Sequence, residues 1–226
     1  METVTYYSGR EISSFEPRSL KIKDGPQGGA RLWLRIVDRY NYCHQLFSEI
    51  NELYKIVIRM ESFPLGDGSL LSPLAQYKFQ SENLIFQIRR TIDSLIQLSS
   101  LTYEHSGNDQ PIKLKTSDLG QLVGKNQTAH LVHPIINGDK EKYAQDGTNF
   151  LEIINDLFNA IKHHASHEED FGIPRDRFPF ITSYYAEKNN YCQPVVFHNH
   201  YLHQLMMGYQ DNVSRIVANL KLALRE

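Results

Sequence analysis

Two long stretches in the first half of the chain repeat apolar residues at the spacing of an amphipathic helix. The first predicts a helix from Ala30 to Glu61, because apolar residues recur in two heptad series: Ile36, Cys43, Ile50, Val57 and Leu46, Leu53, Met60. The second opens with Ser72 as N-cap and Pro73 at the first helical position, and it extends to about Tyr103. Its predicted buried stripe is Leu84, Ile85, Ile88, Ile92, Leu95 and Ile96. A glycine- and proline-containing break at 63–68 predicts an antiparallel helix pair.

The second half of the chain mixes helical and strand patterns. A third helix is expected from about Asp146, with Phe150, Ile153, Ile154, Leu157 and Ile161 facing the core. After Pro174, aromatic and β-branched residues in 178–187 and 191–197 flank Lys188-Asn189-Asn190 and predict a β-hairpin. A last helix is expected from about Asn199 to Leu224.

The segments outside these elements are less regular. Residues 1–30 are polar and rich in glycine, and we expect an extended N-terminal arm with a short strand at Val4–Tyr7. Between the second and third helices we expect a strand at 111–115, a helical turn at 117–122 and a loop at 130–137. The predicted fold is mainly α. It is an up-down bundle of two long antiparallel helices and two further helices, with a small peripheral hairpin at about 178–197 in a single domain of residues 31–226.

Composition narrows the classes of function. A formal net charge of -2 over 226 residues argues against a broad electrostatic nucleic-acid binder but leaves room for a local basic groove. The N-terminus has no basic leader or apolar segment, and no apolar run approaches the roughly 20 residues that span a bilayer. Cys43 and Cys192 share no metal-ligand or redox spacing. We therefore expect a cytoplasmic protein with no membrane partner.

One helical face in the third helix has groups suited to phosphodiester chemistry. Asn159 and His163 stand one turn apart, with Lys162 on the flank. His163 is a candidate general acid or base for cleavage beside a 2′-hydroxyl, which needs neither metal nor cofactor because the substrate supplies the nucleophile. The same residues are also ordinary polar chemistry for a helix end.

Two further groups of residues are candidates for binding. Arg89 and Asp93 form an i, i+4 pair with Glu82 two turns earlier, which predicts an ion-paired strip on the second helix. In the alternative interpretation Arg89 or Arg90 contacts a phosphate, and these arginines with His164 are the candidate ligand-binding residues.

Histidines cluster in two parts of the chain. If the two clusters converged, the metal ligands would be His163, His167, His200 and His203. His200 and His203 are expected to be neighbours on the last helix. The alternative is that they are structural surface histidines, because neither cluster matches a named metalloenzyme motif.

The order of the helices and the segment 157–163 resemble the HEPN superfamily of helical bundles, many of which are ribonucleases in bacterial defence and toxin–antitoxin systems. The active family pattern is an arginine, a polar residue (often asparagine) and a histidine four to six residues beyond the arginine. Asn159 and His163 match it, whereas Phe158 occupies the arginine position. The resemblance also implies a dimer in which two motifs face one cleft.

Three hypotheses follow. The first is a HEPN-like protein that binds RNA, nucleotide or a protein partner without efficient catalysis. The second is an active metal-independent endoribonuclease that uses His163, and the third is a histidine-based metal-binding bundle. A homodimer through the third or last helix is expected from the apolar side chains near the last helix, which exceed the needs of one core face: Phe197, Tyr201, Met206, Met207 and Tyr209.

Overall fold

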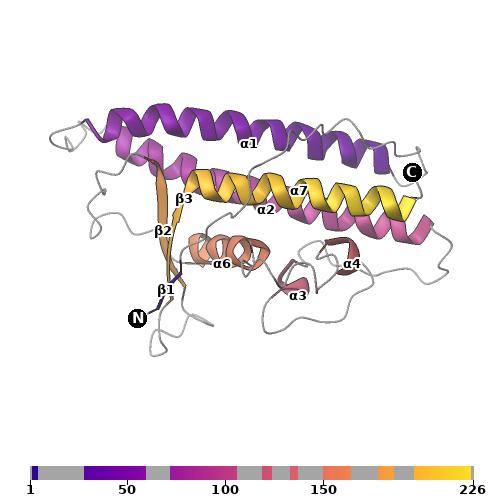
Figure 1. Ribbon diagram of the computed structural model, residues 1–226. Helices are drawn as coiled ribbons and strands as arrows, with labels where there is room; N and C mark the ends of the chain where they lie inside the picture. Colours follow the sequence, from indigo (N-terminus) through magenta and orange to yellow (C-terminus); the bar gives the residue numbers. More distant parts are fainter. Residues whose placement is uncertain are drawn as a thin grey trace.

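Helices dominate the fold, as the apolar pattern predicts (Figure 1). The structure is a computed structural model that describes residues 2–4, 28–59, 72–105, 119–123, 133–136, 150–163, 178–185 and 196–224. The predicted strand at 111–115 and the expected first turn of the third helix at 146–149 lie outside these residues. None of the described helices is both long and apolar enough to cross a membrane.

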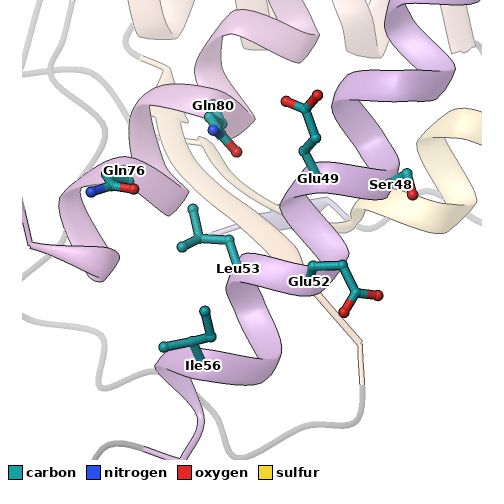
Figure 2. A pocket seen from close by; sticks show the side chains of 7 residues that line it. All are labelled: Ser48, Glu49, Glu52, Leu53, Ile56, Gln76 and Gln80. Carbon is teal, nitrogen blue, oxygen red and sulfur yellow. The ribbon is translucent and has the colours of Figure 1, made fainter.

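The two long predicted helices are present and pack as an antiparallel pair. Helix α1 spans Gly29–Val57 and α2 spans Pro73–His105. The Ser72 Oγ accepts a hydrogen bond from the Ala75 N–H at 3.2 Å, which confirms the predicted N-cap. Both predicted stripes are buried, apart from Leu53, which is half-buried, and Met60, which is not described. Toward the end of α1 the pair leaves an open groove on its outer side (Figure 2).

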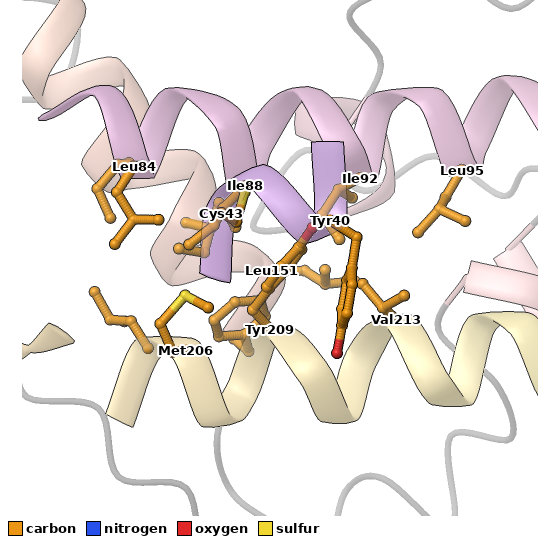
Figure 3. Close-up of a cluster of buried hydrophobic side chains, with 14 of the residues drawn as sticks. Tyr40, Cys43, Leu84, Ile88, Ile92, Leu95, Leu151, Met206, Tyr209 and Val213 are labelled. Carbon is orange, nitrogen blue, oxygen red and sulfur yellow. The ribbon is translucent and has the colours of Figure 1, made fainter. Parts of the chain in front are cut away.

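The last helix completes the core. Helix α7 spans Leu202–Leu224, and its Tyr209 ring packs 5.4 Å from the ring of Tyr40 on α1. Figure 3 shows Met206, Tyr209 and Val213 directed at the buried residues of α2. Met206 and Tyr209 are thus core residues, whereas Phe197, Tyr201 and Met207 are half-buried. Two of the five side chains on which the dimer prediction rests are therefore used inside the protomer.

A second layer lies below α2 and α7 in Figure 1. It contains α6, Phe150–His163, and the short helices α3, Leu119–Leu122, and α4, His133–Ile136. Helix α3 confirms the predicted helical turn, but α4 shows that the loop expected at 130–137 was wrong in part. The carbonyls of Ile135 and Ile136 accept hydrogen bonds from Asn219 at 2.9 Å and Arg215 at 3.1 Å on α7. These tertiary contacts stabilise a turn that the local sequence does not predict.

A small sheet closes one end of the bundle. Strands β2, Phe180–Tyr185, and β3, Val196–Tyr201, form the predicted hairpin, and β1, Glu2–Val4, pairs in parallel with β3. The predicted boundary between the second strand and the last helix was wrong, because β3 continues through Tyr201 and α7 begins only at Leu202. His198 and His200 point inward while Asn199 is exposed, so the period of two continues past the expected end of the strand.

Candidate functional site

Helix α6 contains the motif residues, and their burial differs from one residue to the next. Leu157 and Ala160 are buried, Phe158 and Asn159 are half-buried, and Lys162 is exposed. His163 is the last residue of α6, but its side chain lies outside the described part of the structure, as do residues 164 and 167. The structure therefore locates Asn159 and Lys162 and gives no geometry for the imidazoles of His163, His164 and His167.

Phe158, at the arginine position of the motif, packs against α2. Its ring lies 5.0 Å from the Phe86 ring in an edge-to-face arrangement. The Arg89 Cζ lies over the Phe158 ring, 5.5 Å from its centroid, at a distance typical of a cation–π contact. Arg89 is only 4% exposed and forms the predicted ion pair with Asp93 one turn later. The guanidinium is thus held between a carboxylate and an aromatic ring.

Arg90 lies on a different side of α2 from Arg89. It is exposed, and its carbonyl accepts a hydrogen bond from the Arg39 Nη1 of α1 at 3.1 Å. Consecutive residues of a helix point about 100° apart, so Arg89 faces α6 while the exposed side chain of Arg90 points in another direction. Only one of the two arginines named from the sequence therefore lies beside the motif helix.

Two carboxylates share the motif face of α6. The spacings of four, three and four residues place one stripe along the helix, formed by Glu152, Asp156, Asn159 and His163. Burial and the neighbouring Glu152 raise the pKa of Asp156 to about 6, although a hydrogen bond from Asn155 lowers it. These carboxylates were not singled out from the sequence, yet their i, i+4 spacing was visible there. Their charge opposes the approach of a phosphate to Asn159.

The two histidines of β3 form a buried pair, although the sequence predicted His200 on the last helix. The His198 Nδ1 and His200 Nε2 are 3.1 Å apart, and one of them donates to the other. Burial lowers the pKa of His198 to about 4 and, with the adjacent His198, that of His200 to about 3. Both are therefore neutral near pH 7. The pattern His-x-His indicates a strand, because alternate residues of a strand point to the same side.

The metal alternative gains no support from the described residues. His200 points inward from β3, whereas His203 lies on α7 and packs 4.7 Å from the Phe178 ring and 5.7 Å from the Tyr201 ring. The expectation that they are neighbours on one helix was wrong. In the part of the chain that the structure describes, no three histidine, cysteine or acidic side chains come together as a metal site.

The groove between α1 and α2 was not predicted from the sequence. Its volume is about 360 Å³, and Figure 2 shows its lining: Ser48, Glu49, Glu52, Leu53, Ile56, Gln76 and Gln80. Two carboxylates and two aliphatic side chains lie together there, and none of the described residues that line the groove is basic. This is a surface for cationic or apolar groups, and α2 and α7 separate it from α6 (Figure 1).

Comparison with models of protein families, with curated proteins and with solved structures gives no match.

Proposed function

We propose that this chain is a HEPN-like helical protein that acts by binding a partner and does not cleave RNA efficiently. The observation that favours this function is the packing of Phe158 between Phe86 and the guanidinium of Arg89. Cleavage beside a 2′-hydroxyl develops negative charge on the phosphorane, and a positioned cation stabilises that charge. A phenylalanine in the arginine position provides no cation for this stabilisation.

The neighbouring cations are poor substitutes for the motif arginine. Arg89 is buried and paired with Asp93, and Arg90 is exposed and points about 100° away from Arg89 around α2. Lys162 is exposed, but Glu152 and Asp156 lie on the motif stripe next to it. Phosphate contacts need uncompensated lysine or arginine side chains, and the chain has a net charge of -2. These features favour a protein partner over RNA or a nucleotide.

The test is cleavage and binding of labelled single-stranded RNA by the full chain in the presence of a chelator. We expect intact RNA with the wild type and with His163→Ala, and no saturable RNA binding at physiological salt. Circular dichroism of both proteins confirms that they are folded. Cleavage by the wild type that disappears in His163→Ala would refute the proposal.

The second candidate is an active metal-independent endoribonuclease, and one observation favours it. The Arg89 guanidinium lies against Phe158, so α2 places a cation near the position that the motif assigns to an arginine. In that case Arg89→Gln should abolish cleavage as completely as His163→Ala. Salt-sensitive RNA binding without cleavage would instead make RNA the bound partner and reject the preference for protein.

A further inference from the structure

The α1–α2 pair has the groove of Figure 2 on its outer side, and α1 lies on the other side of α2 and α7 from α6 in Figure 1. We call this side the α1–α2 face and define it by the groove of Figure 2 together with six exposed residues of the two helices, Arg31, Arg35, Tyr42, Glu49, Phe79 and Arg90. The two helices meet along it. The Asn83 Nδ2 donates to the Tyr42 hydroxyl at 3.2 Å, and the Arg39 Nη1 donates to the Arg90 carbonyl and to the Ser94 Oγ at 3.1 and 3.0 Å.

Large apolar side chains are exposed along this face. Tyr42 is 41% exposed, Phe79 52% and Ile56 53%, and Leu53 lies beside Ile56 in the groove. Leu53 and Ile56 line the groove, and apolar residues that lie together beside a groove are typical of a contact surface, whereas single ones are not informative. Tyrosine and phenylalanine are also among the residues enriched at protein interfaces.

The exposed charges in line with Tyr42 on α1 differ between its two ends, although Lys55 and Arg59 make the end of the helix and the turn after it mixed in charge. Arg31 and Arg35 are exposed near its start, with Asp38 one turn further, whereas Glu49 and Glu52 line the groove near its end. A helix is stabilised by acidic residues in its first turn, and the first turn of α1 has none. The stability of the isolated helix therefore does not explain this distribution.

Both glutamates have local partners but retain acceptor capacity. Glu49 accepts a hydrogen bond from Gln45 at 2.8 Å, and Glu52 is paired with Lys55 at 2.6 Å in an exposed position. A carboxylate has about four lone-pair sites, so each can still receive a guanidinium. The groove is thus complementary to the arginine end of the same helix.

We infer that the α1–α2 face is the docking surface for a second copy of this chain. In an antiparallel arrangement about a two-fold axis near Tyr42, Arg31 and Arg35 of each protomer lie over Glu49 and Glu52 of the other. A two-fold interface uses the same patch on both subunits, so a patch with opposite charges at its ends is complementary to itself. The apolar side chains near the axis are then removed from water.

The size of the face suits such a dimer. The 29 residues of α1 extend over about 43 Å at the rise of an α-helix. Two helices packed side by side are about 18 Å wide, which gives about 800 Å² on each protomer, the area of a standard interface. The α6 motif remains on the outside of this dimer, so the two motifs do not share a cleft.

The experiment is sedimentation equilibrium of the full chain over a range of protein and salt concentrations. We expect a dimer that weakens as salt rises, because the ion pairs lie at the exposed ends of the interface. Arg35→Glu and Glu49→Arg should each weaken association about tenfold or more, since each sets like charges opposite one another. An equimolar mixture of the two variants should restore association, because every contact in the mixed dimer then joins opposite charges.

Lys162→Glu, an exposed charge reversal on α6, is the matched control and should leave the dimer unchanged. Circular dichroism melting shows whether each variant is folded, and Tyr42→Ala provides a second, uncharged test of the same surface. A monomeric wild type at all concentrations would overturn the inference. So would a dimer that both charge reversals leave intact, a mixture that fails to recover, or dissociation by Lys162→Glu alone, which would place the interface on α6.

Discussion

Phe158 shows how a single side chain can determine both packing and chemistry. The ring joins α6 to α2 through Phe86 and supports the guanidinium of Arg89. The sequence identifies Phe158 as a departure from an arginine-containing motif. It does not reveal that Arg89, 69 positions earlier, lies against the same ring, because only the packing of α6 on α2 creates that contact. The candidate residues were thus predictable, but their meeting at this point was not.

The packing of Phe158 leads to a prediction at the scale of the residue. Phe158→Arg should lower the free energy of unfolding by about 2 kcal/mol, because it removes the aromatic and cation–π contacts and sets a second guanidinium beside Arg89. Urea denaturation measures the change. Phe158→Leu is the matched control and should cost about 1 kcal/mol, since it keeps an apolar side chain without adding charge. Equal stability of the arginine variant and the wild type would show that Phe158 does not bridge the helices.

At the scale of elements, apolar period and capping chemistry predict the long helices well. The heptad series of α1 and the Ser72 cap of α2 both appear in the structure. Prediction is weaker where tertiary contacts decide. Helix α4 depends on hydrogen bonds from α7, and β3 extends past its expected end because the bundle and sheet bury His198 and His200. Polar residues in a buried strand resemble a loop until their surroundings are known.

The buried pair on β3 makes the stability of the sheet and its junction with α7 depend on pH. The pKa of His198 is about 4 in the folded protein, against 6.5 for an unperturbed histidine, so below pH 6.5 the unfolded chain binds a proton that the folded chain does not. The stabilisation is present above pH 6.5 and is lost as the pH falls toward 4. Urea denaturation at several pH values should show that the free energy of unfolding decreases by about 3 kcal/mol as the pH falls across this range.

Two variants separate this effect from general acid denaturation. His198→Leu with His200→Leu should flatten the pH dependence in this range, because neither leucine titrates. Asp156→Asn tests a group whose effect on stability changes with pH in the opposite direction. The raised pKa of Asp156, about 6, means that its proton is held more tightly in the folded state, so this variant should gain stability at about pH 7 but little at about pH 4. An unchanged slope in the double leucine variant would exclude the histidine pair as the cause.

At the scale of the whole molecule, the three long helices converge on Tyr209. Its ring packs on Tyr40 of α1, and its hydroxyl lies near the Cys43 thiol and the Thr91 hydroxyl of α2. Burial raises the pKa of Cys43 to about 12, so this thiol is protonated and unreactive and serves as part of the core. One residue of α7 thereby contacts both helices of the pair that bears the proposed dimer face.

This convergence predicts that α1, α2 and α7 unfold together. The single tryptophan, Trp33, is buried on α1 and reports on that helix, whereas far-ultraviolet circular dichroism reports on all of them. The two probes should give coincident urea transitions in the wild type. Tyr209→Ala should lower the free energy of unfolding measured by both probes by about 4 kcal/mol, because it leaves a cavity. The control Tyr209→Phe should lower it by about 1 kcal/mol, because it removes only a hydroxyl. A tryptophan transition at a lower urea concentration than the circular dichroism transition would mean that α1 separates from the bundle first. Dimerisation through the outer face of α1 would then have to stabilise the fold as well.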